Sequence, residues 1–196
     1  MAGITQEKVG YLTVSKGRMV NKAEKKDFGG YAGTFLGLRE KQGEFEGKPQ
    51  IRIELKMKDT DSDEVVIIQF TKRAFAAAGL LSTIQKVDLS KPFTVKVWGS
   101  EENEKISFCG ICQEGYKYVE KRKTIEADKT FPRPKLIMIN GEKQYDWTEV
   151  MVAMDGVIKA VNEKFQPAPA AASEATAAPA SAADTLLVAD ESDLPF

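Results

Sequence analysis

The chain has 196 residues and a formal net charge of −1, which hides an uneven distribution of charge. Residues 166–196 contain five acidic groups and no Lys or Arg, so this segment carries −5 and leaves +4 on residues 1–165. The absence of histidine excludes Ser-His-Asp and Cys-His nucleophiles, HExxH zinc sites and histidine acid–base chemistry. A mildly basic body suits an anionic ligand and an acidic tail suits a basic partner, although the same division of charge also serves solubility alone.

Composition divides the chain into four segments. Residues 1–118 contain short β-type runs and are expected to form the ligand-binding domain. Residues 119–165 combine a charged linker, an apolar strip and an amphipathic helix, as an extension of that domain. Residues 166–189 are an Ala/Pro/Ser/Thr tract that we expect to be a disordered linker, and residues 190–196 are an acidic tip.

A basic loop is predicted near the start of the chain, over residues 16–26. Its single acidic residue is outnumbered by five basic ones, which are Lys16, Arg18, Lys22, Lys25 and Lys26. Such a loop could close on a phosphate backbone, and the alternative is a solvated loop with no such task.

Two strands with period-two alternation follow this loop. In residues 31–39 the pattern puts Leu36 and Leu38 on one face, and it predicts an outward face of Tyr31, Phe35 and Arg39. Several glycines among these aromatic residues indicate strong curvature. In residues 50–58 the inward set is Ile51, Ile53, Leu55 and Met57, and the outward set is Arg52, Glu54, Lys56 and Lys58.

The order of the remaining elements predicts the fold class. The apolar run at residues 65–68 indicates a strand that is buried on both faces, and alanine-rich residues 72–85 favour a short helix. Residues 93–99 and 105–113 then form a hairpin, whose first strand turns Lys96 and Trp98 outward. Strands, one helix and two further strands predict a mainly β protein with an OB-fold, a five-stranded Greek-key barrel with its helix between strands 3 and 4.

The extension contains an apolar strip at residues 136–139, an Asn140-Gly141 turn and a C-terminal helix. Asp146 followed by Glu149 predicts a capping box with Asp146 as the N-cap. The helix carries one apolar stripe, formed by Val150, Met151, Met154, Val157, Ile158, Val161 and Phe165. We expect this stripe to pack on the barrel, and self-association through it is the alternative.

Motifs for metal, redox or nucleotide chemistry are incomplete. Cys109 and Cys112 form a CxxC without a second ligand pair, and residues three apart on a strand point to opposite faces. Asp59, Asp61 and Asp63 imitate a calcium loop, but the sixth position lacks glycine and the twelfth lacks glutamate. No GxxxxGK[ST] phosphate loop occurs. We therefore expect no cofactor, no metal and no enzymatic activity.

Sequence-tolerant binding of a single strand requires a basic groove that follows the phosphates and aromatic faces on which bases stack. The outward residues supply both, with Tyr11, Tyr116 and Tyr118 as weaker candidates. The predicted nucleic-acid-binding residues are Lys16, Arg18, Tyr31, Phe35, Arg39, Arg52, Lys56, Lys58, Lys96 and Trp98.

The last residues carry a resemblance to a known family. An acidic cluster, a hydrophobic residue, proline and a terminal phenylalanine resemble the C-terminal peptide of bacterial-type single-stranded DNA-binding proteins. The resemblance implies an OB-fold body, a tether, and a tip that recruits replication, recombination and repair proteins. It implies that Phe196 and its carboxylate enter a partner pocket, that Leu194 and Pro195 shape the approach, and that Asp190, Glu191 and Asp193 meet a basic rim.

The resemblance is incomplete at the N-terminal end, where the expected opening strand motif is missing. The chain therefore resembles a divergent member of the family, such as one encoded by a bacteriophage or a plasmid, acting as a monomer or homodimer. With two cysteines, no signal peptide and no long apolar run, we expect it in the bacterial or infected-host cytoplasm, without a membrane partner. An RNA-binding or strand-annealing protein and a protein-binding adaptor remain alternatives. A metal-dependent nuclease is disfavoured, because its candidate ligands Asp59, Asp61, Asp63 and Glu64 sit in one turn without a convincing base or cleft.

Overall fold

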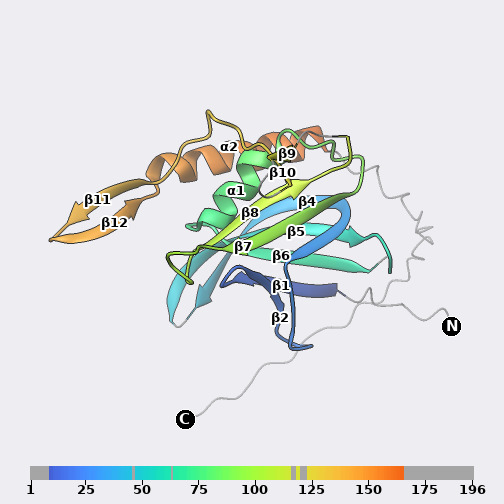
Figure 1. Ribbon diagram of the computed structural model, residues 1–196, viewed down its shortest axis with the longest axis horizontal. Coiled ribbons are helices and arrows are strands. Elements are labelled where there is room, and N and C mark those ends of the chain that lie inside the picture. The colour runs from blue at the N-terminus through green and yellow to red at the C-terminus, as the bar shows by residue number, and fades with distance from the viewer. Residues whose placement is uncertain (1–8, 46, 63, 116–117, 120–122, 166–196) are drawn as a thin grey trace, which may run out of the picture.

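The computed structural model describes residues 9–45, 47–62, 64–115, 118–119 and 123–165 (Figure 1). The elements are β1 (Val9–Ser15), β2 (Arg18–Asn21), β3 (Lys26–Phe28), β4 (Gly30–Phe45), β5 (Lys48–Asp59), β6 (Val65–Thr71), α1 (Phe75–Ile84), β7 (Phe93–Gly99), β8 (Ser107–Cys112), β9 (Tyr118–Val119), β10 (Thr124–Ile125), β11 (Lys135–Ile139), β12 (Glu142–Asp146) and α2 (Thr148–Lys164). The predicted linker 166–189 and tip 190–196 lie outside the described residues.

Eight strands form one curled sheet in the order β3-β2-β1-β6-β5-β4-β7-β8. All neighbouring strands of this sheet run antiparallel except the pair β1 and β6, which is parallel. As expected, β6 is buried on both faces, with Val65, Val66, Ile67 and Ile68 all at most 7% exposed. The mainly β class is confirmed, and the predicted short helix forms as α1 between β6 and β7.

The sheet differs from the expected closed five-stranded barrel. Within the described ranges no ladder joins β6 to β8, because β1 occupies the free edge of β6. The turn between β1 and β2 instead meets the β7–β8 edge, where the Gly17 N–H donates to Ser107 Oγ at 2.8 Å. Gly17 has φ +72°, and a Cβ there would lie 2.2 Å from the Gly99 nitrogen, so only glycine fits this contact.

A β-bulge in β4 decides which side chains face the core. The register with β5 shifts between Phe35 and Gly37, so Leu36 is an extra residue. Since alternate residues of a strand face opposite sides, one extra residue reverses the pattern beyond it. Phe35 before the bulge and Leu38 after it are both buried, whereas Arg39 faces outward.

Both helices cover the core side of the sheet. The predicted stripe of α2 packs on the core through Val150, Met154, Val157 and Val161, which confirms packing on the sheet. The expected capping box is wrong in detail, because Trp147 is the N-cap residue and makes no side-chain cap bond. Asp146 is the last residue of β12, and its carboxylate accepts the N–H of Thr148, the first residue of α2.

Strands β11 and β12 form a hairpin that projects beyond the rest of the molecule (Figure 1). Asn140 and Gly141 have φ of 52° and 84°, as a two-residue type I′ turn requires, so the predicted turn is confirmed. We call residues 135–146 the arm. No helix in the described ranges is both long and apolar enough to cross a bilayer.

Candidate nucleic-acid interface

Five cations share the outward side of β4 and β5, which we call the basic face. Across the two strands Lys41 pairs with Arg52, Gly37 with Lys56 and Thr34 with Lys58, while Arg39 pairs with Glu54. Directly paired residues lie on the same side of a sheet, so these side chains form one surface. Its cations are Arg39, Lys41, Arg52, Lys56 and Lys58. Of the residues predicted from sequence, Arg39, Arg52, Lys56 and Lys58 are thus brought together.

Glu54 is the centre of this face, and its side chain is 1% exposed. Its carboxylate accepts bonds from Arg39 Nε at 2.8 Å and Nη2 at 2.7 Å, and from Gln69 Nε2 at 2.9 Å. Lys41 Nζ lies 3.6 Å from the same carboxylate. Burial acts to raise the pKa of Glu54, but the bonds from Gln69 and Arg39 outweigh it, and the pKa is lowered.

One buried carboxylate therefore orients cations whose side chains remain accessible. The Arg39 side chain is 64% exposed and that of Lys41 is 52% exposed. With five cations and one buried carboxylate among its side chains, this face carries net positive charge, which suits an anionic ligand. The outward alternation of β5 predicted Lys56 and Arg52, but sequence reasoning missed Lys41 and the organising role of Glu54.

An exposed tyrosine lies beside the basic face. Tyr11 of β1 pairs with Ile67 of β6, on the same side of the sheet as Lys56, and is 48% exposed. It borders a cleft of about 410 Å³ whose lining also includes Arg39 and Lys56. An accessible phenol ring next to cations can stack on a planar ligand group while the cations bind anionic groups.

Lys96 lies on the same side of the sheet, across the first half of β4. The outward positions between it and Lys58 are Gly30, Ala32 and Thr34, which carry small side chains only. The sheet surface is therefore low between the two lysines, and an extended ligand could cross it without meeting a bulky group. The predicted outward direction of Lys96 is confirmed, because Lys96 pairs directly with Gly30, which is an outward position of β4.

Trp98 is partly covered by neighbouring aromatic rings. It packs nearly parallel to Phe108 of β8, with ring centroids 6.3 Å apart and an angle of 26° between the planes. Phe108 in turn contacts Phe75 of α1 at 5.8 Å. Trp98 is thus part of an aromatic cluster near the edge of the sheet, and it shares the outward side of β7 with Lys96.

The predicted outward direction of Phe35 and Tyr31 is wrong, because both side chains face the core side. Phe35 is 1% exposed. Tyr31 packs against the core, and its hydroxyl donates to Asp59 Oδ2 at 2.5 Å. Burial first, and then Asp59, raise the pKa of Tyr31, while this bond lowers the pKa of Asp59 to about 2. The bulge explains the error, since a single alternation cannot hold on both sides of it.

Lys16 and Arg18 lie at the β1–β2 turn, separated from the basic face by β1 and β6. Arg18 Nε is 3.2 Å from Asp27, and Lys16 Nζ is 3.9 Å from Glu104. These acidic partners reduce the positive charge of the predicted basic loop, so the turn is a weaker anion site than the basic face.

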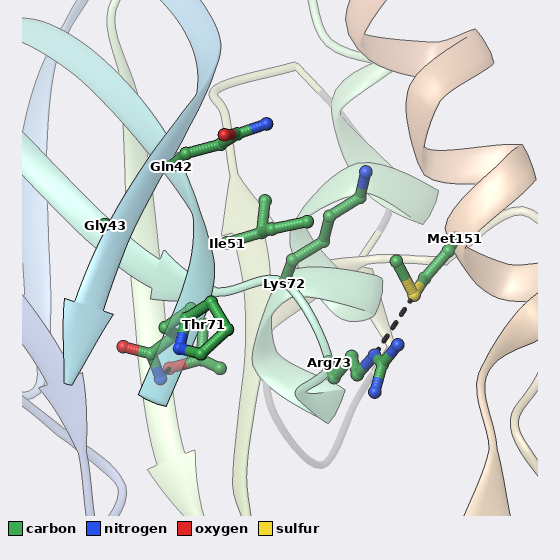
Figure 2. Close-up of a pocket in the computed structure, with 9 residues that line it drawn as sticks. Gln42, Gly43, Ile51, Thr71, Lys72, Arg73 and Met151 are labelled. Atoms are coloured by element: carbon green, nitrogen blue, oxygen red, sulfur yellow. Dashed lines mark hydrogen bonds between the residues drawn. The ribbon is translucent and has the colours of Figure 1, made fainter. Parts of the chain in front are cut away.

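A second cleft, of about 660 Å³, opens between the far end of the β4–β5 hairpin and α2 (Figure 2). Figure 2 shows Arg73 reaching toward α2, where its Nε is 3.4 Å from Met151 Sδ. Lys72 is buried there and binds Glu40 and Asp155. Burial acts to lower the pKa of Lys72, but its two carboxylate partners outweigh this and raise it. None of the predicted binding residues lines this cleft. Its contacts hold α2 against the sheet, since Arg73 meets Met151 and Lys72 binds Asp155.

The candidate interface is therefore the basic face with Tyr11 and Lys96 at its margins. It can bind an extended polyanion and stack planar groups, and it contains no arrangement of groups recognisable as a catalytic centre within the described residues. Comparison with protein-family models, with curated proteins and with solved structures finds no match to this chain.

Proposed function

We propose that this protein binds single-stranded DNA with little sequence preference, and that the basic face is its main contact surface. The observation that carries the proposal is the set of five cations on one side of β4 and β5, two of them paired with buried Glu54, beside exposed Tyr11. Phosphate contacts supply affinity that falls with salt, and each base stacked on an aromatic ring contributes about 1–3 kcal/mol.

The form of the surface supports a single strand over a duplex. Tyr11 and Trp98 offer ring surface for stacking, and a base can stack on such rings only when it is not already paired and stacked in a helix.

We also propose that the body is an elaborated OB-fold. The order β4-β5-β6-α1-β7-β8 has the connectivity of that fold, with β4 pairing with both β5 and β7. In OB-folds the second and third strands carry the oligonucleotide-binding face. Their counterparts are β5 and β6, and the basic face includes β5. In this proposal, β1–β3 are an N-terminal addition that fills the edge of β6.

The acidic tip is proposed to recruit replication, recombination and repair proteins. The support is chemical: a negative cluster followed by Leu194, Pro195 and Phe196 offers charge for steering and an aromatic anchor for a pocket. Binding of DNA and of proteins would then belong to separate parts of the chain.

Fluorescence anisotropy tests the DNA proposal. Labelled oligothymidine and a duplex of equal length are titrated with the full chain across a salt series, with an equal-length RNA as competitor. We expect preferential binding of the single DNA strand and affinity that decreases as salt rises. Equal affinity for duplex, or no binding at low salt, contradicts the proposal, and preferential capture of RNA would favour the RNA-binding alternative.

A further inference from the structure

The arm exposes apolar residues on both of its faces. In β11 the exposed fractions are 55% for Leu136, 37% for Ile137, 63% for Met138 and 43% for Ile139. Within the described chain β11 pairs only with β12, so its other edge is open. A two-stranded hairpin alone is marginal in water, and an open apolar edge strand is a template for pairing with another chain.

Contacts at its base hold the arm in a defined position. Tyr145 and Trp147 both meet the ring of Phe75 edge-on, with centroids 5.1 and 5.2 Å apart. Lys135 forms an ion pair with Glu149 in the first turn of α2. The arm is therefore presented by α1 and α2 as a fixed projection (Figure 1).

The charges of the arm indicate what kind of partner fits. Its two basic residues, Lys135 and Lys143, are balanced by Glu142 and Asp146. The open strand has no charge between residues 136 and 139. A neutral aliphatic edge offers nothing to a phosphate backbone and no steering toward a strongly charged protein. It does complement a second neutral aliphatic edge, and an identical copy supplies one.

We propose that this protein self-associates through the arm, with β11 of one copy pairing antiparallel to β11 of a second copy. A twofold axis at Ile137 aligns all five residues of each strand. Lys135 then faces Ile139 of the second copy, and Leu136 faces Met138. The two hairpins become one four-stranded sheet whose aliphatic side chains cover one another.

The backbone of the hairpin supports this register. In a two-residue hairpin the flanking pair, Ile139 and Glu142, exchanges hydrogen bonds. Alternation then points the N–H and C=O groups of Leu136 and Met138 to the open edge. Pairing centred on Ile137 satisfies these groups in both copies. It also makes the two Ile137 residues a non-hydrogen-bonded pair, in which side chains approach most closely.

Sedimentation velocity of the full chain over a concentration series tests this pairing. The contact is a small one, so we expect a concentration-dependent rise of the average mass from 21.6 kDa toward twice that value. Ile137→Lys and Ile137→Glu each place like charges opposite one another and should remain at the monomer mass. An equimolar mixture of the two variants should regain the heavier species, since opposite charges then meet at the axis.

Val152→Lys is the matched control, because Val152 is an exposed aliphatic residue of α2 outside the arm, at 70% exposure. It should associate as the unchanged chain does. Circular dichroism establishes that each variant is folded. The proposal is overturned if the unchanged chain stays at the monomer mass at all concentrations, if Ile137→Lys associates normally, or if the mixture of charge variants remains monomeric. None of these outcomes depends on DNA binding, so the proposal stands or falls separately from the proposed function.

Discussion

The ring of Phe165 stands edge-on against the ring of Phe35, with centroids 4.7 Å apart and 89° between the planes. The contact fixes the C-terminal end of α2 on β4, directly before the bulge. Asn162 strengthens it by donating to the Leu38 carbonyl at 2.7 Å. Phe165, the last residue that the structure describes, also lines the cleft that contains Tyr11 beside the basic face.

Replacing Phe35 should therefore affect folding more than ligand binding. Phe35→Ala removes a fully buried ring and its contact with Phe165, at an expected cost of about 3–5 kcal/mol. Urea unfolding followed by circular dichroism measures the loss. Well below the unfolding midpoint the variant should bind oligothymidine as the unchanged chain does. A loss of affinity with unchanged stability would instead place Phe35 in the interface.

Tyr11 should show the opposite behaviour, since it is exposed beside the cations. Tyr11→Ala should weaken oligothymidine binding by about 1–3 kcal/mol, as removal of one stacking platform does, with little change in unfolding free energy. Tyr145→Ala is a control that removes another exposed aromatic ring, on the arm. Equal affinities of the two variants would show that Tyr11 contributes no stacking.

The outward pattern of β5 could be predicted from sequence, because Ile53, Leu55 and Met57 alternate with charged residues without interruption. The Asn140-Gly141 turn was also predictable, since its type needs residues that accept positive φ. In both cases the determining interactions lie within a few residues of one another.

The errors arose where distant parts of the chain decide the structure. The glycines of β4 indicated curvature, but they did not identify Leu36 as the extra residue that turns Phe35 inward. Burial of Glu54 depends on cover from Arg39 and Gln69 on neighbouring strands. The parallel pairing of β1 with β6 joins segments far apart in sequence, for which no local pattern exists.

The salt dependence of binding tests whether Lys56 contacts phosphate. Each phosphate contact with a single strand contributes about 0.7 to the slope of log affinity against log salt, so Lys56→Gln should reduce that slope by about 0.7. Lys159→Gln makes the same change of charge on α2, where the side chain is 78% exposed. We expect that control to leave the slope unchanged. Identical slopes for both variants would exclude a phosphate contact at Lys56.

Glu54 should make stability depend on pH in the acid range. Its pKa is lowered in the folded protein, so its ionisation stabilises the fold above the unfolded value of about 4.3. That contribution is lost as pH falls through the folded pKa. Glu54→Gln should cost about 1–3 kcal/mol at neutral pH, and the difference from the unchanged chain should narrow below about pH 4.

Urea midpoints measured between neutral and acid pH provide the test for Glu54. Glu163→Gln removes the same charge from an exposed site on α2, where the expected cost is below about 1 kcal/mol. A difference between Glu54→Gln and the unchanged chain that stays constant down to the acid limit would show that the carboxylate is not linked to folding.

Deleting residues 190–196 should tighten single-strand binding at low salt and abolish recruitment of partner proteins. Phe165 lies beside the basic face, and a chain of 24 residues such as 166–189 spans at most about 80 Å, so we expect the acidic tip to compete with DNA for the cations. The gain should vanish at high salt, because screening shortens the range of the attraction to a few ångströms. Phe196→Ala, which keeps the tip's acidic residues, should retain the unchanged DNA affinity but lose partners. Anisotropy titrations of the three proteins at low and high salt decide the point, and equal low-salt affinity of the full and truncated chains would show that the tip does not compete.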